Sequence, residues 1–236
     1  MIPIPWLDED TPGFPPVEEA LQDPDGLLAM GGDLSPAWLV QAYSLGIFPW
    51  YQEGEPILWW SPSVRMGLFP EQLVVSRSMR KLLRKGEFEV TFDRAFVQVI
   101  ANCAAWRPER TATWITDDMQ QAYCRMHELQ IAHSVEVWRQ GELVGGLYGI
   151  ASGNLFFGES MFSLQPNASK IATIALCRQL QRWGYHLIDC QIPSEHLASL
   201  GARQVTRAEF QDILLRYGHS GGKNGQWILE PDILEC

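Results

Sequence analysis

Residues 133–150, HSVEVWRQGELVGGLYGI, give the clearest indication of the fold. The runs 133–138 and 143–150 flank Arg139-Gln140-Gly141-Glu142, a turn sequence that indicates a β-hairpin. In the second run, the pair Gly145-Gly146 removes two side chains, which is typical either of a close approach by another segment or of a bulge. We therefore expect two adjacent antiparallel strands at the centre of the chain.

On either side of the hairpin, the sequence predicts a mixture of strands and helices. Strand patterns occur at 88–92, 154–157 and 185–191. Helical spacing or capping signals predict helices at 95–103, after Thr116, at 167–183, around 194–200 and at 207–217. Hairpin strands followed by a helix and another strand indicate the α+β class, with a mixed sheet flanked by helices, rather than a doubly wound sheet.

The first 60 residues are rich in proline and in turn signals. They contain one clear helix, in which Ser35 is the N-cap, Pro36 is the first helical residue and Gly46 is the stop. A short apolar run then ends at Ser61-Pro62. We expect a small N-terminal domain at residues 1–62 and a larger domain at residues 63–236.

The composition is that of a folded protein with an acidic balance. Apolar residues make up 46% of the 236 residues, and 28 acidic against 18 basic residues give a net charge of −10. This balance argues against a protein that coats nucleic acid. The five cysteines are irregularly spaced, and we identify no signal peptide and no apolar run of about 18 residues, so we expect a cytoplasmic protein with reduced thiols. Ten Trp residues indicate that some line a pocket or a binding surface.

The densest run of positive charge lies within residues 76–85. Its basic residues follow the spacing i, i+3, i+4, i+7, i+8, which places them on one face of a helix, and they are Arg77, Arg80, Lys81, Arg84 and Lys85. Like charges at this spacing repel one another. In a chain that is otherwise acidic, the run indicates a phosphate-binding surface, and a solvated helix face is the alternative.

Two segments place polar side chains among apolar ones. Glu159 lies in the apolar run 156–162, where a half-buried carboxylate needs a partner; a surface Glu at a strand end is the alternative. In the predicted strand 185–191, Asp189 and Gln191 project together and Cys190 points the opposite way. An Asp beside a Gln can orient an amide and hold a nucleophile that bears a proton, whereas the alternative is a carboxylate that caps the following helix.

The chain resembles the bacterial leucyl/phenylalanyl-tRNA–protein transferase family from about Pro15 to Arg216. Long segments carry this resemblance in order along the sequence. They are GLLAMGGDLSP (26–36), GIFPWY (46–51), ILWWSP (57–62), SRSMRK (76–81), TWIT (113–116), ELVGGLYGI (142–150), FGESMFS (157–163), NASK (167–170) and LIDCQ (187–191).

The resemblance implies an enzyme that takes Leu or Phe, and less readily Met, from aminoacyl-tRNA. The enzyme joins that residue to the N-terminal α-amine of proteins that begin with Arg or Lys, which marks them for N-end-rule degradation in the cytoplasm. The resemblance also implies an acyl-CoA N-acyltransferase-like fold for the larger domain. We expect a monomer with no membrane partner. We expect no cofactor and no metal, because an aminoacyl ester is already activated and the enzyme mainly has to position the amine.

The family's functional positions fall on specific residues of this sequence. Asp189 and Gln191 match the catalytic pair, in which Asp189 orients Gln191, and Glu159 matches an acidic residue suited to hold an amine. Trp50 and Trp114 match aromatic walls of the pocket for the amino-acid side chain, with further lining expected from Leu147, Phe156, Met161, Leu176 and Ile188. Leu176 stands where some relatives have a ring. The basic residues of the 76–85 run match the cluster that binds the tRNA acceptor arm.

Two other classes of function remain open from the residues alone. A carbohydrate-active hydrolase fits the many Trp residues and the carboxylates Glu159 and Asp189, but it leaves the basic run unexplained. The other class is a non-catalytic tRNA or peptide adaptor, in which the basic run binds and no reaction takes place.

Overall fold

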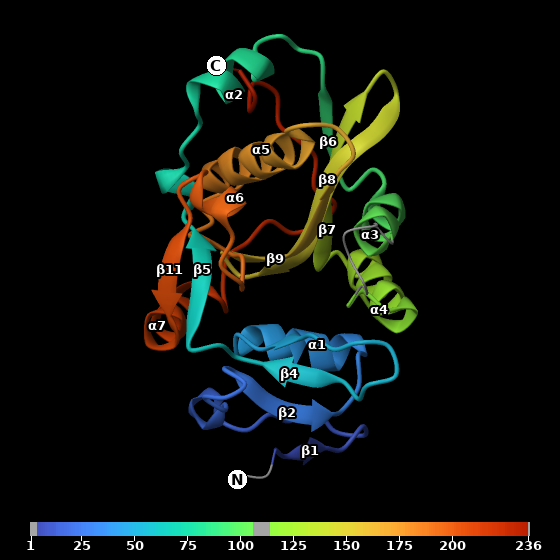
Figure 1. Ribbon diagram of the computed structural model, residues 1–236, viewed down its shortest axis with the longest axis vertical. Coiled ribbons are helices and arrows are strands. Elements are labelled where there is room, and N and C mark those ends of the chain that lie inside the picture. Colours follow the sequence, from blue (N-terminus) through green and yellow to red (C-terminus); the bar gives the residue numbers. More distant parts are fainter. Residues whose placement is uncertain (1–3, 106–113, 236) are drawn as a thin grey trace.

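The computed structural model describes residues 4–105 and 114–235, which form two sheets with helices around them (Figure 1). Thr113 and Cys236 lie outside the described residues. The larger sheet has seven strands in the order β11-β5-β10-β9-β8-β7-β6. Its strands are β5 (Val64–Leu68), β6 (Glu89–Phe92), β7 (Ala132–Arg139), β8 (Glu142–Ser152), β9 (Leu155–Ser163), β10 (Leu187–Asp189) and β11 (Arg203–Thr206). β10 runs parallel to β9, and the other neighbouring pairs are antiparallel. The expected α+β class with a mixed sheet is confirmed.

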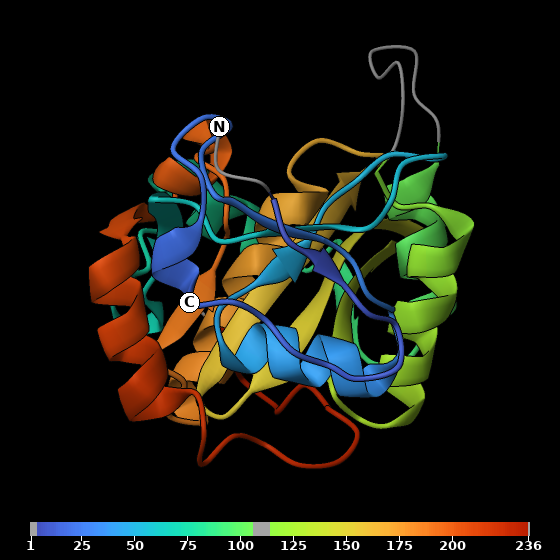
Figure 2. The same cartoon turned by 90° about the horizontal axis from the view of Figure 1, so that it is seen from below.

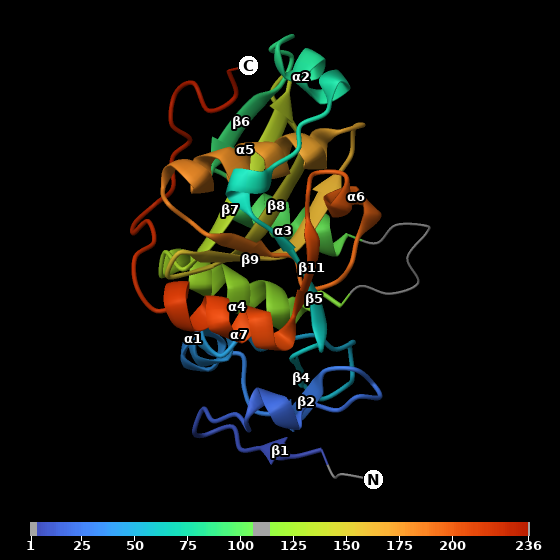
Figure 3. The same ribbon diagram turned by 90° about the vertical axis from the view of Figure 1, so that its left-hand side faces the viewer.

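Helices cover both faces of this sheet. The helices are α2 (Arg77–Leu83), α3 (Phe96–Ala104), α4 (Asp117–Glu128), α5 (Ala168–Arg182), α6 (Glu195–Ala198) and α7 (Arg207–Tyr217). The side chain of Leu147 packs in the same core cluster as α5, whereas its neighbour Tyr148 packs with α3 and α4. Successive residues of a strand point to opposite faces, so α5 covers one face and α3 and α4 cover the other (Figure 3).

Residues 6–60 contain the smaller, four-stranded sheet, in the order β1-β2-β4-β3. Its strands are β1 (Trp6–Leu7), β2 (Leu27–Gly31), β3 (Phe48–Pro49) and β4 (Leu58–Trp60). Helix α1 (Pro36–Ser44) lies between this sheet and the larger one (Figures 1 and 2). The expected start of α1 at Pro36 is confirmed. Tyr43, near its end, is buried against Phe157 of β9.

The central hairpin is formed by β7 and β8, as expected. The register of the two strands shifts beside Val144, so this hairpin contains a bulge. Helix α5 also approaches closely, because a Cβ atom added at Gly145 would lie 2.4 Å from the Cβ of Ala168. Both interpretations of the Gly145-Gly146 pair are therefore correct.

Two expected strand boundaries are wrong. The strand predicted at 154–157 is β9, which continues to Ser163, and the strand predicted at 185–191 is reduced to β10. β9 is longer because it pairs with β8 along almost its whole length. β10 ends at Asp189 because Gln191, two residues later, has a φ of 51° and leaves the extended region. None of the helices in the described residues combines the length and the apolar character that a membrane crossing requires.

Candidate active site

A mainly apolar cavity of about 340 Å³ lies where β8, β9, β10 and α5 meet. All the residues expected in the side-chain pocket line it, and they are Trp50, Trp114, Leu147, Phe156, Met161, Leu176 and Ile188. Glu159 and Gln191 line it as well. The structure therefore brings the expected pocket together with two of the three expected catalytic residues.

A β-bulge in β9 shapes this pocket. The register between β8 and β9 shifts at Glu159, which is left without a partner on β8. The extra residue places Phe156 and Met161, which are five positions apart, on the same face of the sheet. The bulge thus aligns two apolar walls and turns a carboxylate toward the cavity between them.

Tryptophan residues contribute the outer walls. Trp50 follows β3 and is 41% exposed, and its ring centroid lies 5.8 Å from that of Trp60. The indole Nε1 of Trp60 donates a hydrogen bond to the carbonyl oxygen of Trp50 at 2.7 Å. Trp114 is half-buried and precedes α4. Because Trp50 is tied to the backbone pairing of the small sheet, residues 6–60 provide part of the pocket.

Glu159 is held by side chains from two other parts of the chain. Its Oε2 accepts a hydrogen bond from the hydroxyl of Tyr123 at 2.9 Å, and its Oε1 accepts one from Nε2 of Gln191 at 3.2 Å. Burial raises the pKa of Glu159 to about 7, and these hydrogen bonds oppose the rise. The alternative of a surface Glu at a strand end is wrong, since Glu159 lies inside β9.

Asp189 lies behind the pocket and is fully buried. Its Oδ2 accepts a hydrogen bond from Nη1 of Arg65 at 2.7 Å, and its Oδ1 accepts one from the backbone N–H of Gln191 at 3.0 Å. Arg65 also donates to the carbonyl oxygen of Gly46, and its guanidinium carbon lies 4.2 Å from the ring centroid of Phe210. Burial raises the pKa of Asp189, while Arg65 and the Gln191 N–H act in the opposite direction.

The expected facing of residues 189–191 is wrong. Cys190 and Gln191 both line the cavity, and Asp189 points away from it toward Arg65. The alternation of a strand fails here because β10 ends at Asp189 and the positive φ of Gln191 turns the chain. Burial raises the pKa of the Cys190 thiol, which disfavours the thiolate. The alternative role for Asp189 as a helix cap is also wrong, since no side chain caps α6.

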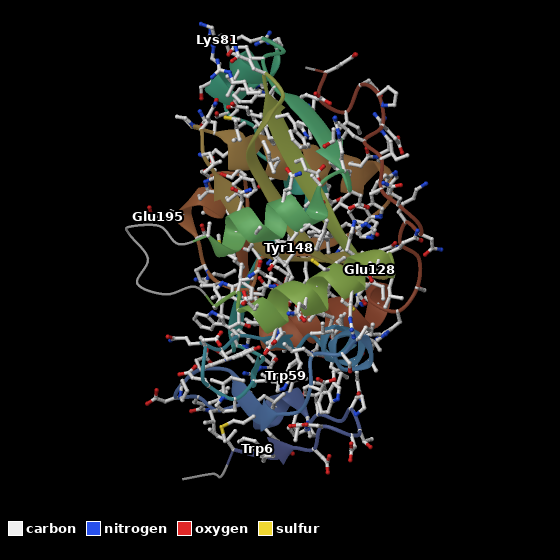
Figure 4. The ribbon with its side chains drawn as sticks, turned by 90° about the vertical axis from the view of Figure 1, so that its right-hand side faces the viewer. Trp6, Trp59, Lys81, Glu128, Tyr148 and Glu195 are labelled. Atoms are coloured by element: carbon white, nitrogen blue, oxygen red, sulfur yellow. The ribbon has the colours of Figure 1, made fainter. Side chains whose placement is uncertain are left out.

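The basic run forms the exposed helix α2 and the two residues after it. Its five basic side chains are exposed, and Met79 packs inward. The hydroxyl of Ser76 caps the helix by accepting the N–H of Met79 at 3.2 Å. Lys85 lies 3.6 Å from Glu87 at the surface. Helix α2 and Lys81 lie at one end of the molecule and the small sheet with Trp6 at the other (Figures 1 and 4). The described residues that line the pocket include none of α2.

Three residues of this site are not predicted from the sequence. Arg65 is missed, although its position inside the apolar strand β5 signals a buried charge that needs a partner. Tyr123 and Tyr43 are missed as well, and no sequence signal distinguishes them from core residues. Among the described residues, no group of three or more His, Cys, Asp or Glu side chains is arranged to hold a metal ion.

Comparisons with known proteins identify the class of this chain. The family model described as "Leucyl/phenylalanyl-tRNA protein transferase" matches residues 67–215, and the model of that family's N-terminal domain matches residues 32–63. A leucyl/phenylalanyl-tRNA–protein transferase from Pseudomonas putida (strain W619) is 60% identical over 90% of this chain and 94% of its own length. The corresponding protein of Nitrosospira multiformis is 54% identical over 98% of this chain and 100% of its own length.

These relatives show that the protein is an enzyme of the aminoacyltransferase class, whose reaction involves tRNA. More specifically, the chain belongs to the leucyl/phenylalanyl-tRNA protein transferase family. Among solved structures, the chain is similar to a functionally unknown conserved protein from Staphylococcus epidermidis, with a TM-score of 0.42 and 11% sequence identity. The match covers 76% of this chain and 68% of that protein's chain.

Proposed function

We propose that this enzyme moves Leu or Phe, and less readily Met, from aminoacyl-tRNA to the N-terminal α-amine of proteins that begin with Arg or Lys. The observation that carries the proposal is the composition of the pocket, in which apolar walls end at the carboxylate of Glu159 and the amide of Gln191. An apolar cavity fits the side chain of Leu or Phe, and the polar end fits an amine and an ester carbonyl.

In this proposal, Asp189 orients Gln191, and Gln191 positions the incoming amine. The hydrogen bond from the Gln191 N–H to Oδ1 of Asp189 supports the first role, because it fixes the backbone that bears the amide. Glu159 holds the ammonium or amine of the acceptor protein. The proton of the amine leaves either through this group of side chains or through the ribose hydroxyl of the tRNA.

The pocket walls set the preference among amino acids. An apolar pocket distinguishes side chains by about 1–3 kcal/mol for each methylene, which suits a preference for Leu and Phe that still admits Met. Met161 supplies a flexible wall that accepts both a branched and a flat side chain, and Leu176 adds an aliphatic wall.

The basic residues of the 76–85 run bind the acceptor arm of the tRNA in this proposal. All five are exposed and therefore accessible to phosphates. Residues 1–62 act as a small N-terminal domain that completes the pocket through Trp50, and residues 63–236 act as the catalytic domain. The enzyme works as a monomer in the cytoplasm, and its product is marked for N-end-rule degradation.

A transfer assay tests the proposal. Labelled Phe-tRNA is incubated with the purified enzyme and a protein that begins with Arg, and the same protein that begins with Ala is the control. We expect label on the first protein alone. If the protein binds tRNA but transfers no Phe, the result supports the alternative of a non-catalytic tRNA or peptide adaptor. If it releases sugar from a glycan, the result supports the alternative of a carbohydrate-active hydrolase.

A variant separates catalysis from binding. We expect Asp189→Ala to lower turnover far more than it lowers tRNA affinity, because Asp189 acts on Gln191 and lies apart from α2. Equal losses in both would make Asp189 a purely structural residue.

A further inference from the structure

A chain of hydrogen bonds leads from the pocket into the core between the two sheets. It begins at Nε2 of Gln191, which lies 3.2 Å from Glu159, and continues from Glu159 to the hydroxyl of Tyr123 at 2.9 Å. The hydroxyl of Tyr123 lies 2.6 Å from that of Tyr43. Both tyrosines are buried, Tyr123 on α4 and Tyr43 on α1. Four separate parts of the chain therefore meet at Glu159.

The number of hydrogens fixes the direction of this chain when Glu159 is ionised. A carboxylate only accepts hydrogen bonds, so Tyr123 donates its single hydroxyl hydrogen to Glu159. The oxygen of Tyr123 then accepts the hydrogen of Tyr43. Both hydroxyl hydrogens thus find acceptors, and each bond in the chain favours the ionised form of Glu159.

We propose that Tyr123 and Tyr43 are positioning residues for the transfer reaction, because their hydroxyls orient Glu159 and keep it as the carboxylate that holds the α-ammonium of the acceptor protein. The inference rests on the proposed function in its role for Glu159. It adds that α1, which belongs to residues 1–62, takes part in the chemistry through Tyr43.

The charges around Glu159 make this support necessary. Burial and the negative charge of Asp189 raise the pKa of Glu159, whereas the hydroxyls of Tyr123 and Tyr43 and the amide of Gln191 lower it, and the resulting pKa is about 7. The charge of Arg65 is paired with Asp189 at 2.7 Å. The hydroxyl of Tyr148, on β8, has no hydrogen-bond partner among the described residues, and the pKa of that phenol is raised, first by burial and then by Glu159.

Loss of the Tyr123 hydroxyl removes one of the interactions that lower the pKa. The pKa of Glu159 then rises further above its value in the wild type, and a larger fraction of Glu159 is neutral at pH 7. A neutral carboxyl group no longer attracts an ammonium ion, so the acid side of the pH–rate profile moves to higher pH.

The experiment compares Tyr123→Phe and Tyr43→Phe with a matched control, Tyr185→Phe. Tyr185 is also buried, and its hydroxyl accepts a hydrogen bond from the backbone N–H of Lys223 at 3.1 Å. The titration of Glu159 is followed by carbon-13 NMR of side-chain carboxyl groups, with Glu159→Gln to assign the signal. The pH dependence of kcat/KM for Phe transfer and the thermal unfolding temperature are measured for each variant.

We expect the titration midpoint of Glu159 to rise by about one pH unit in Tyr123→Phe and to rise in Tyr43→Phe as well. We expect the acid limb of kcat/KM to move by the same amount, while Tyr185→Phe leaves both values at those of the wild type. A midpoint that is unchanged in Tyr123→Phe, or that moves equally in Tyr185→Phe, overturns the inference. If the wild type transfers no Phe, the proposed function fails, and the NMR titration alone decides whether the tyrosines control Glu159.

Discussion

Replacing Arg65 with Met tests how the buried pair beside the pocket supports the fold and the site. Nη1 of Arg65 lies 2.7 Å from Oδ2 of Asp189, and both side chains are at most 2% exposed. Met fills part of the apolar volume but leaves the carboxylate of Asp189 buried without a cation. We expect Arg65→Met to lower the free energy of unfolding by about 3–5 kcal/mol at pH 7, as for other buried pairs that lose one partner.

The pH dependence of this loss of stability tests whether the unpaired charge of Asp189 causes it. Without Arg65, the pKa of Asp189, already raised by burial, rises further above its value in the unfolded chain. Between those two pKa values the folded state binds more protons than the unfolded state, so the variant becomes more stable as the pH falls. In urea titrations of both proteins, the loss should be smaller at pH 5 than at pH 7. An equal or larger loss at pH 5 would refute the buried-charge explanation.

A double variant isolates the charge of Asp189 from the volume of Arg65. Asp189→Asn in the Arg65→Met background removes the unpaired charge, so we expect this second change to cost less than Asp189→Asn costs in the wild type. Arg65→Met should also lower turnover, because Asp189 holds the backbone N–H of Gln191 at 3.0 Å. Filter binding of tRNA should be retained, since α2 lies apart from this pair.

Two further predictions concern other regions. Replacing Arg80 and Lys81 with Gln should weaken tRNA binding and leave the fold unchanged. The slope of log affinity against log salt concentration should fall in magnitude by about one for each phosphate that is no longer neutralised. An unaltered slope would show that α2 is not part of the tRNA-binding surface. Gly145→Ala should lower the stability by about 1–3 kcal/mol in urea titrations, since the added Cβ would lie 2.4 Å from the Cβ of Ala168. Gly158→Ala is the control, with its nearest atom at 3.6 Å, and an equal loss there would contradict the packing argument.

Local signals predict the elements of this fold well. The hydroxyl of Thr116 accepts the backbone N–H of Met119 at 3.2 Å, so the expected N-cap of α4 is correct. The hairpin and α5 are also found where spacing and turn residues indicate them. These signals lie within a few residues of the structure that they specify, because caps and turns satisfy nearby backbone groups.

The geometry of the site depends on contacts that span the chain. Arg65 and Asp189 are 124 residues apart, and the hydroxyls of Tyr43 and Tyr123 pair across 80 residues. Strand alternation misplaces Gln191 relative to Asp189, because a single positive φ at Gln191 is not visible in the pattern of side chains. The resemblance to a family supplies the pocket residues, whereas the partners that hold the carboxylates require the folded chain.

The distribution of charge along the molecule explains how an acidic chain can present the tRNA-binding surface that we propose at α2. Residues 1–62 contain ten acidic residues and no Lys or Arg, which leaves 18 acidic and 18 basic residues in the rest of the chain. The whole net charge of −10 therefore belongs to the small-sheet end, opposite Lys81 and α2 (Figure 4). At physiological salt, charges are screened over about 8 Å, so acids at the far end do not cancel the field of α2. Phosphates respond to that local field rather than to the net charge.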